Sequence, residues 1–474
     1  MNPERDIRIS NYRIDCLLSA TGWMRDAVVT VSEQGLITGL SAGLNAGAHA
    51  ADATHIRGTV VPGMPNAHSH AFQRAMAGDS ELRSGARDSF WSWREAMYAL
   101  ANGVEPEDLE LIATQLFIEM LKAGYTSVAE FHYLHRRADG SAYPDANALW
   151  QAIDAAAGTA GIALTLLPTL YLSSDFGARP LRREQQRFRL SVEEFLQAIA
   201  RRRSGLAQQD GALVHTGAAL HSLRAVPLDC LREAVAGLRA IDPAGVIHIH
   251  IAEQLLEVHA CQSETGRRPI ELLLDTGLVG PQWCLVHATH ATASEIAGVA
   301  ASEASVCVCP STEGNLGDGF FDAARLLAAG AGLCIGSDSQ ATVCPAEELR
   351  WLEYQQRLKR RRRAVLATRA EPHVGARLWR EATRCGARAL GQNIGTIQIG
   401  RRADWLVLDA AHPALAGADE DGLLDRLVFS GGRAAVRDVM VAGRWVVKDG
   451  QHRREEEVAA RFATWMRQRP SRTY

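Results

Sequence analysis

The stretch GTVVPGMPNAHSHAFQ (residues 58–73) joins an apolar run, typical of a buried strand, to two histidines one residue apart, His68 and His70. On an extended chain, side chains at positions i and i+2 point to the same side, so both imidazoles can converge on one point. A single His-x-His pair is a weak indication of a site, because a strand can end in such residues by chance. Comparable groups at the ends of other apolar runs decide how the pair is interpreted.

Seven further apolar runs rich in Val, Ile and Leu follow, and helical patterns lie between them. In segment 106–124, for example, apolar residues recur at helical spacing, and Gly124 provides a helix stop. Eight strands that alternate with helices over about 280 residues predict a (β/α)8 barrel of the TIM type. The expected strands are 59–64, 126–131, 163–171, 213–221, 245–253, 283–290, 305–312 and 332–338.

Both ends of the chain have a β-rich pattern. The N-terminal part contains a hairpin pattern around Glu33-Gln34-Gly35, and the C-terminal part contains a turn at Ala442-Gly443. Neither end can close a hydrophobic core alone, so we expect one small β-sandwich domain that is built from both termini. The expected division is 1–58 and 393–455 for the β-domain, and 59–392 for the barrel with added helices in 346–392.

Length and composition exclude several classes of protein. The 474 residues carry a formal net charge of -3 with 22% charged residues, whereas nucleic-acid binders are usually basic. No uncharged apolar run is long enough to span a membrane, and the first ten residues lack the apolar segment of a secretory signal. The nine cysteines favour buried free thiols in a reducing compartment. We therefore expect a cytoplasmic protein that binds neither nucleic acid nor membrane.

Ionisable groups stand at the ends of several predicted strands. His248 and His250 alternate in HIHIAE (248–253), with Glu253 just beyond, while His287 ends strand six and Asp338 follows strand eight. The carboxyl ends of barrel strands share one rim, where barrel enzymes carry their active sites. His248 lies two residues deeper than His250, and we expect it to be a histidine of the core.

Three imidazoles and a carboxylate suit Zn²⁺ with one position open for water; the expected ligands are His68, His70, His250 and Asp338. Iron or another divalent ion can use similar ligands. A bound water then ionises near neutral pH and can act as a nucleophile. Glu253 is expected to move a proton, and His287 to hold the water or polarise developing charge. Strand four ends without a lysine that could bridge a second metal.

These motifs resemble those of the amidohydrolase superfamily, in particular its mononuclear deaminase branch. The resemblance covers most of the chain and rests on PGMPNAHSH, HIAE, the strand-six histidine, GSDS and the return EATRCGARALG to the β-domain. Within that branch the chain is similar to the N-formimidoyl-L-glutamate deiminases of histidine degradation. The stretches that carry this finer similarity are NAHSHAFQRAMAG, FWSWREAMY, AEFHYLH, ALHSLRAV and STEGNLGDG.

The resemblance implies hydrolytic deamination of N-formimidoyl-L-glutamate to N-formyl-L-glutamate and ammonia, by a homodimer with one zinc ion per subunit. It implies the zinc ligands named above, with Glu253, His287 and Asp338 as proton-handling residues. It also implies that five residues hold the substrate: Gln73, Arg94, Tyr133, His221 and Arg224. We expect Arg94 to lie in a loop, where it acts in its own or in a neighbouring subunit's site.

This small dicarboxylate amidine substrate also fits the residues physically, because the planar guanidinium of arginine suits carboxylates. An alternative is a deaminase of an aromatic base, such as guanine or a triazine, which needs a flat stacking pocket and fewer arginines. A catalytically silent barrel is a further alternative, but such relatives usually lack the metal ligands. The aromatic-rich segment 89–98 is expected to be a lid or a subunit contact, and the basic run 357–364 a solvated helix face.

Overall fold

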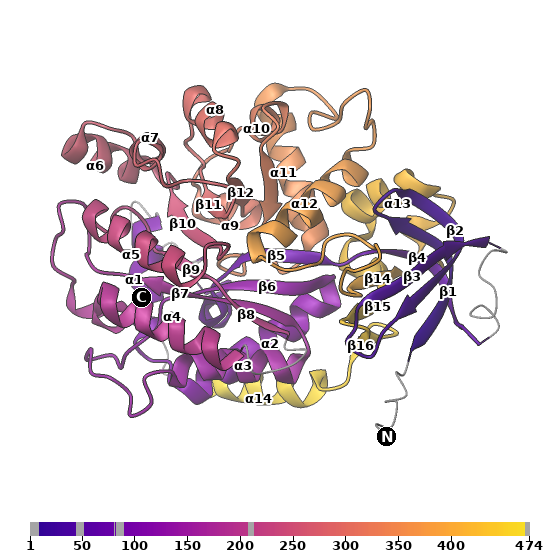
Figure 1. Cartoon of the computed structure of the whole chain (residues 1–474), viewed down its shortest axis with the longest axis horizontal. Coiled ribbons are helices and arrows are strands. Elements are labelled where there is room, and N and C mark those ends of the chain that lie inside the picture. Colours follow the sequence, from indigo (N-terminus) through magenta and orange to yellow (C-terminus); the bar gives the residue numbers. More distant parts are fainter. Residues whose placement is uncertain (1–8, 44–51, 80, 82–89, 207–212, 470–474) are drawn as a thin grey trace, which may run out of the picture.

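The structure is a computed structural model that describes residues 9–43, 52–79, 81, 90–206 and 213–469. Two sheets organise the chain: a parallel barrel, and a second sheet at one end of the molecule that combines indigo and yellow segments (Figure 1). The barrel strands are β5 (Met64–Ser69), β6 (Tyr125–His132), β7 (Ala163–Leu170), β8 (Val214–Thr216), β9 (Ala218–Leu220), β10 (Ile247–Ile251), β11 (Trp283–His287), β12 (Ser305–Val308) and β13 (Gly332–Ile335).

The barrel sheet follows chain order from β5 to β13, with β8 pairing beside the main path on β7. All residues of β6 and β7 are buried, because side chains fill the inside of a barrel and helices cover its outside. The first and last strands meet at their carboxyl ends, where His68 O accepts from Ser337 N at 3.0 Å and His70 N donates to Asp338 O at 3.1 Å. These bonds close the barrel at the rim that carries the predicted ligands.

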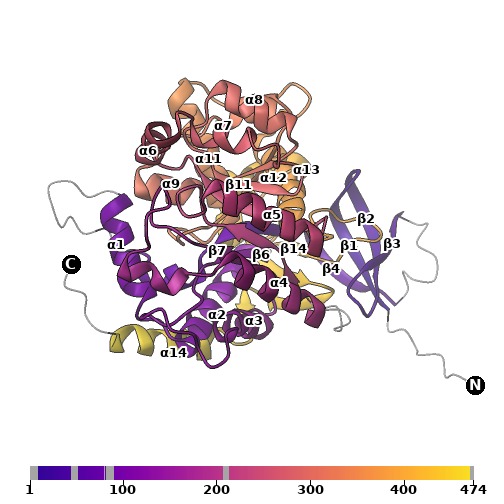
Figure 2. The same cartoon turned by 60° about the vertical axis from the view of Figure 1, so that its left-hand side comes forward.

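Helices surround the barrel (Figures 1 and 2). The C-terminal end of α12 lies against the amino-terminal end of the barrel, where Leu390 O accepts from Thr165 Oγ1 at 2.8 Å. The helices of this layer are α1 (Phe90–Ala101), α2 (Pro106–Ala123), α3 (Ala148–Ala160), α4 (Val192–Leu206), α5 (Leu228–Ile241), α6 (Leu255–Thr265), α7 (Pro269–Leu274), α8 (Ala293–Ala301), α9 (Pro310–Leu316), α10 (Ala323–Ala328), α11 (Pro345–Arg360) and α12 (Val374–Leu390).

The second sheet has eight strands from both ends of the chain, in the order β17-β16-β15-β14-β4-β1-β2-β3. Both predicted hairpin turns are present, and they touch, because Gly35 packs so closely on the carbonyl of Ala442 that a Cβ there would collide. The strands are β1 (Ser10–Ser19), β2 (Gly22–Val31), β3 (Ile37–Ala42), β4 (Thr54–Pro62), β14 (Trp405–Leu408), β15 (Val436–Val441), β16 (Arg444–Lys448) and β17 (Gln451–His452). α13 (Glu420–Arg426) precedes β15, and α14 (Glu455–Gln468) ends the described chain beside α2 (Figure 2).

The predicted barrel with a β-domain from both termini is therefore confirmed, but the first barrel strand was placed wrongly and the fourth is divided. The run 59–64 is not the first barrel strand: residues 59–62 belong to β4 of the terminal sheet, and β5 begins at Met64. Gly63 separates the two strands and packs against Thr126. Strand four is divided into β8 and β9. The predicted boundary between residues 58 and 59 lies inside β4, and the division into two domains stays a prediction.

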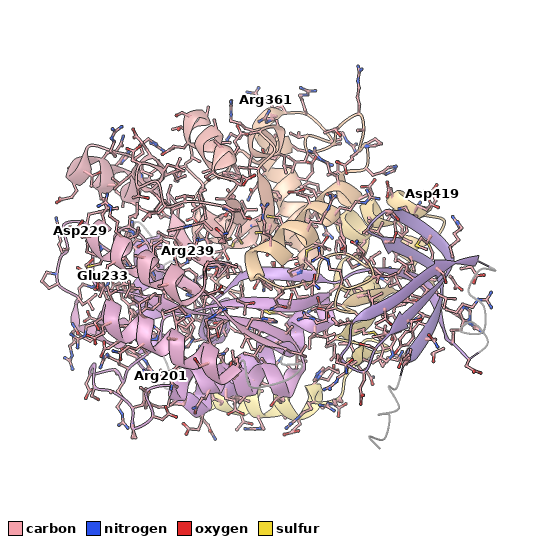
Figure 3. All side chains as sticks on the ribbon, in the orientation of Figure 1. Arg201, Asp229, Glu233, Arg239, Arg361 and Asp419 are labelled. Carbon is pink, nitrogen blue, oxygen red and sulfur yellow. The ribbon has the colours of Figure 1, made fainter. Side chains whose placement is uncertain are left out.

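The basic run 357–364 lies at the end of α11, and Arg361 projects into solvent (Figure 3). Arg360 pairs with Asp322 at 2.6 Å and Arg357 with Glu353 at 2.7 Å. Residues 360–364 are exposed, as expected for a solvated helix end. None of the described helices combines the length and apolar character that a membrane span requires.

Candidate active site

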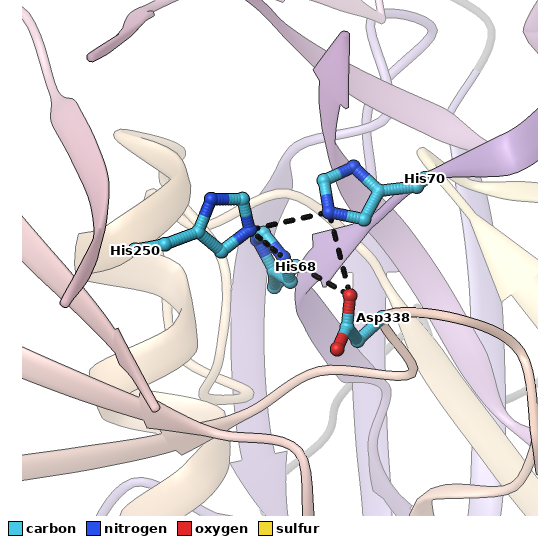
Figure 4. A group of neighbouring side chains, drawn as sticks. All are labelled: His68, His70, His250 and Asp338. Atoms are coloured by element: carbon cyan, nitrogen blue, oxygen red, sulfur yellow. Dashed lines mark hydrogen bonds and ion pairs between the residues drawn. The ribbon is translucent and has the colours of Figure 1, made fainter. Parts of the chain in front are cut away.

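Four predicted ligands from three parts of the barrel converge at its carboxyl rim (Figure 4). His68 and His70 come from the end of β5, His250 from β10, and Asp338 from the segment after β13. The Nε2 atom of His250 lies 3.1 Å from that of His68 and 3.2 Å from that of His70. Asp338 Oδ1 lies 3.3 Å from His68 Nε2 and 3.4 Å from His70 Nε2. Four ligands at the usual Zn–N and Zn–O distances from one ion are about 3.3 Å apart, so the spacing fits.

The outer nitrogens of two rings determine which inner nitrogens are free. His70 Nδ1 donates to the carbonyl of Phe131 at 2.8 Å, and His250 Nδ1 donates to the carbonyl of His221 at 2.9 Å. Neutral rings in this tautomer present lone pairs on both Nε2 atoms. Lone pairs that face each other at 3.2 Å repel unless a cation lies between them. This arrangement fits a metal ion better than it fits a set of hydrogen bonds.

Burial sets the protonation states that a metal requires. Removal from water lowers the pKa of His68 to about 3, and lowers the pKa of His70 and His250 as well. Burial alone would raise the pKa of Asp338, but the neighbouring His68 ring outweighs it and holds that pKa below the ordinary value. The group thus offers neutral imidazoles and an ionised carboxylate. His248 lies outside it, and its Nε2 contacts Ala389 O at 2.8 Å, as expected of a core histidine.

A buried carboxylate that the sequence motifs did not single out fixes the loop after β5. Glu130 on β6 accepts hydrogen bonds from Ser69 Oγ at 2.7 Å and from Ala71 N at 2.6 Å. Burial raises the pKa of Glu130 to about 8. Because its two partners flank His70, Glu130 holds the backbone that aims this ring.

The predicted proton-handling residues stand beside the ligand group. Glu253 Oε1 lies 3.6 Å from His287 Nε2, which lies 3.7 Å from Asp338 Oδ2. Burial raises the pKa of Glu253 to about 7. Burial disfavours a charged ring at His287, but Glu253, Glu313 and Asp338 together raise its pKa well above the ordinary value. A protonatable carboxyl and an imidazolium thus share one small space, which suits general acid–base chemistry.

The backbone is strained where these groups leave the strands. Ala252, His287 and Asp338 have φ values of 51°, 69° and 45°, although none is a glycine. Positive φ at residues with a side chain costs free energy and is concentrated at functional sites. Here it turns Glu253, His287 and Asp338 toward the same point above the barrel.

Glu313, like Glu130, is a buried carboxylate whose role the sequence did not indicate. It lies in the motif STEGNLGDG. It lies in the first turn of α9, is buried, accepts from Cys309 N at 2.9 Å, and places Oε1 3.4 Å from His287 Nδ1. A carboxylate at this nitrogen fixes the orientation of the ring and stabilises its charged form. The Cys309 thiol also lies within 4.8 Å of the His287 and Asp338 atoms.

We expect Glu313→Gln to lower kcat by roughly ten- to a hundred-fold, with unchanged metal content, because such supporting residues typically contribute this much. Loss of the negative charge lowers the pKa of His287 toward that of Glu253, so fewer molecules carry both protons as pH rises. The alkaline limb of the pH profile of kcat should therefore move to lower pH. Steady-state rates across pH measure this. Glu303→Gln, at an exposed position, is the matched control. An unshifted profile in Glu313→Gln would contradict this role.

Three of the predicted substrate residues line the pocket above the metal group. Gln73 Nε2 donates to the hydroxyl of Tyr133 at 2.9 Å, and Gln73 Oε1 is buried without a hydrogen-bond partner among the described residues. The Tyr133 ring stands edge-on to His70, with 5.0 Å between ring centres, and to His221 at 5.5 Å. Burial lowers the pKa of His221 well below its ordinary value. These groups therefore form neutral, polar walls.

The other two predicted substrate residues are cations that face the same pocket. Arg94 lies in α1 and not in a loop, so that expectation was wrong; its guanidinium stacks on Trp91, 4.3 Å from the ring centre. Arg224 is buried, and neither arginine forms a salt bridge with a described residue. Repulsion from Arg224 contributes to lowering the pKa of Arg94, after burial itself. Glu257 and Glu253 stabilise the charge of Arg224 from a distance, but neither arginine is bound directly by a described carboxylate. Two close cations in this state indicate a binding site for anionic groups.

Two tyrosines between these arginines were not foreseen. Gln185, in the short helix η3 (Arg183–Phe188), donates through Nε2 to Tyr98 Oη at 3.0 Å and to Tyr171 Oη at 2.9 Å. Both tyrosines line the pocket and accept from the same amide, and Tyr171 also forms a hydrogen bond with Tyr98, so one hydroxyl proton of the pair remains for another partner. The sequence carried no signal for this cluster, because its three residues come from distant segments. Phe90 and Trp93 of α1 also line the pocket, and the role of segment 89–98 as a lid or a subunit contact stays a prediction.

Comparison with known proteins identifies the family. The model of the amidohydrolase family matches residues 59–446. The chain belongs to the amidohydrolase family. A formimidoylglutamate deiminase of Pseudomonas aeruginosa is 49% identical to this amidohydrolase over 441 residues, which cover 93% of this chain and 95% of that protein. An 8-oxoguanine deaminase of the same species is 29% identical over 399 residues, or 83% of either chain.

Among solved structures, an amidohydrolase from Brucella melitensis superposes with a TM-score of 0.89 and 40% identity, covering 96% of this chain and 99% of that one. The similarity to formimidoylglutamate deiminases that the motifs indicated is thus confirmed. This amidohydrolase is a hydrolytic enzyme with a candidate metal site of three histidines and one aspartate.

Proposed function

We propose that this amidohydrolase hydrolyses N-formimidoyl-L-glutamate to N-formyl-L-glutamate and ammonia, with one zinc ion held by His68, His70, His250 and Asp338. The observation that carries the proposal is the pair of guanidiniums, Arg94 and Arg224, in the pocket that opens onto this group. A glutamate derivative brings two carboxylates to the same place as its reacting carbon. The similarity to a formimidoylglutamate deiminase over almost the whole chain supports the same choice.

The relative positions of the arginines suggest how the substrate lies. Arg224 follows β9 closely along the chain, is buried, and interacts electrostatically with Glu257 and Glu253. Arg94 lies on α1 and interacts with Arg182, which is exposed. Arg224 is therefore the inner cation and suits the α-carboxylate, which is close to the formimidoyl group along the substrate. Arg94 is the outer cation and suits the side-chain carboxylate. Tyr98 and Tyr171 interact with both arginines, and the hydroxyl proton that the pair does not share can be donated to a substrate carboxylate.

A bound zinc ion supplies a water of lowered pKa and polarises the group that it contacts. Water oxygen forms a bond to the formimidoyl carbon, and Asp338 accepts a proton from that water. Glu253 donates a proton to the imino nitrogen, and the imidazolium of His287 stabilises the negative charge that develops on oxygen. The nitrogen then receives the proton that Asp338 had taken. As the carbon–nitrogen bond breaks, ammonia leaves, the formyl C=O forms, and the proton of the added hydroxyl passes to Glu253 and restores its acid form. The products are N-formyl-L-glutamate and one ammonia.

A deaminase of aromatic bases is the second candidate, since the pocket also contains Phe90, Trp93, Tyr171 and Phe188. A neutral base offers no carboxylate to either arginine. Two desolvated cations facing a neutral ligand would weaken its binding, so the dicarboxylate amidine fits better.

The test is ammonia release by the purified, zinc-loaded protein from N-formimidoyl-L-glutamate, with guanine and 8-oxoguanine in parallel. We expect ammonia and N-formyl-L-glutamate in equal amounts, and no ammonia from the bases. Ammonia from a base alone would overturn the substrate while leaving the metal chemistry in place. The predicted homodimer stays a prediction that the molar mass in solution measures.

Removal of the metal is expected to abolish activity. Dialysis against a chelator should lower the rate at least about a thousand-fold, because it removes the source of the activated water. One equivalent of Zn²⁺ per chain should restore the rate. Activity that persists without metal would contradict the assignment, and restoration by Fe²⁺ or Mn²⁺ but not Zn²⁺ would replace the proposed ion.

A further inference from the structure

Three cysteines from neighbouring barrel strands lie together, deeper in the barrel than the histidine group. Cys284 is on β11, Cys307 on β12 and Cys334 on β13, and their sulfur atoms all lie within 4.8 Å of one another. All three side chains are fully buried. Nothing in the proposed deamination uses them.

The register of the strands explains why these thiols meet. Cys284 is paired with His248, Val286 with His250 and with Cys307, and Cys307 with Cys334. Partners in adjacent strands point to the same face of a sheet, and His250 points into the barrel. The three thiols therefore project into the interior, toward its amino-terminal end. They lie below the rim, so they form a group separate from the four predicted zinc ligands.

The guanidinium of Arg388 lies at the amino-terminal end of the barrel, next to these strands. Arg388 of α12 donates to Ser305 Oγ at 3.1 Å from Nε and 2.9 Å from Nη2, and its Nη2 lies 3.9 Å from the Cys385 sulfur. Gly332 leaves the space for this contact, because a Cβ there would collide with the guanidinium. No described carboxylate forms a salt bridge with Arg388. Arg388 is itself exposed, so this end of the barrel reaches solvent.

The chemistry of the group points to soft metal ions. Thiolates favour ions such as Cu⁺, Cd²⁺ and Zn²⁺, and this cluster contains no carboxylate or imidazole that would favour harder ions. Three thiolates around a divalent ion leave one negative charge, which the neighbouring Arg388 can offset. Hydrogen bonds from Cys307 and Cys334 lower the pKa of Cys284 to about 6, whereas burial raises the pKa of Cys307 and the hydrogen bond with Cys284 raises that of Cys334. A metal ion must therefore displace the protons of Cys307 and Cys334 as it binds.

We propose that Cys284, Cys307 and Cys334 form a second metal site, which binds a soft, thiophilic ion through three sulfur atoms. Binding of a divalent ion forms three metal–sulfur bonds and releases the three thiol protons to solvent. The site is independent of the deaminase reaction. Its ligands are all sulfur, so it favours soft ions such as Cu⁺ and Cd²⁺ more strongly than the rim site does.

Cadmium is the probe that tests this site. We expect the zinc-loaded, full-length protein to bind one Cd²⁺ per chain with the ultraviolet charge-transfer absorption of cadmium–thiolate bonds, and with release of up to three protons to a pH indicator. Cys334→Ser should abolish this absorption and weaken cadmium binding at least about a hundred-fold. Ammonia release by Cys334→Ser, unchanged from the wild type, shows that the variant is folded.

Cys344→Ser is the matched control, because Cys344 is buried but lies outside the cluster, at the start of α11. It should bind cadmium as the wild type does. If Cys334→Ser does not fold, Cys307→Ala carries the same expectation. Wild-type protein that shows no thiolate absorption with excess cadmium would overturn the proposal, and so would an equally strong absorption in Cys334→Ser. In either case the three thiols serve as small apolar packing groups.

Discussion

Glu253→Gln should lower kcat by about a thousand-fold while the protein keeps its metal. The carboxyl lies 3.6 Å from His287 Nε2 and is buried, but it is not one of the four predicted ligands. An amide has nearly the same shape but cannot deliver a proton, and loss of a positioned general acid typically costs between a hundred- and ten-thousand-fold. The rate of ammonia release at saturating substrate, together with metal analysis of the same sample, measures this effect.

The same residue predicts the pH dependence. With a pKa of about 7, Glu253 is protonated in about nine tenths of the molecules at pH 6 and in about one tenth at pH 8. A proton donor acts only in its protonated form, so kcat/KM should fall as pH rises through 7. Glu264→Gln is the neighbouring control, because Glu264 lies at an exposed position of α6, the helix that follows Glu253, and outside the pocket lining. Equal losses in both variants would show that the segment, and not the acid, is responsible.

Arg224→Gln should lower kcat/KM for N-formimidoyl-L-glutamate by roughly a hundred-fold, mainly through KM. Loss of one partner from a buried, charge-assisted pair costs about 3 kcal/mol, which corresponds to that factor. The contact is made to a carboxylate away from the reacting carbon, so it stabilises the bound substrate and the transition state equally. Its loss should therefore raise KM and change kcat little. Initial rates over a range of substrate concentrations separate KM from kcat.

Formamidine, which carries the same reacting carbon but no carboxylate, sharpens this prediction. Its hydrolysis, although slow, should be nearly equal in wild type and Arg224→Gln, since the arginine has no anion to bind. Arg201→Gln, on the exposed face of α4, should leave both substrates unaffected (Figure 3). A comparable loss with formamidine would mean that Arg224 supports the catalytic groups and does not bind a carboxylate.

Much of the fold could be predicted because its periodic signals are local. Apolar runs with intervening helical patterns indicate a barrel wherever they occur, and His68, His250 and Asp338 could be placed on one rim by the rule that strand ends share a face. The error at 59–64 has a simple cause. β4 and β5 are adjacent apolar runs separated only by Gly63, and hydrophobicity alone cannot show that they belong to different sheets.

The supporting residues could not be placed in the same way. Glu313 lies beside His287 because α9 begins directly after β12, and Gln185 reaches Tyr98 and Tyr171 from a short helix far along the chain. Such contacts depend on loop paths and on the packing of side chains, which leave no periodic trace in a sequence. Glu130 is a similar case, since a carboxylate inside a buried strand indicates a partner without identifying it.

The place of β4 in the terminal sheet has a consequence for biosynthesis. β4 lies between β1 and β14, and its partner in β14 follows more than three hundred residues later. While a ribosome is still making the barrel, one edge of β4 has no strand to pair with, and its apolar side chains cannot yet be fully covered. Unpaired apolar edges promote aggregation, and contacts distant in sequence form slowly. Yield from rapid expression should therefore depend on chaperones, and truncation before residue 405 should leave an aggregating chain even though every predicted zinc ligand is present.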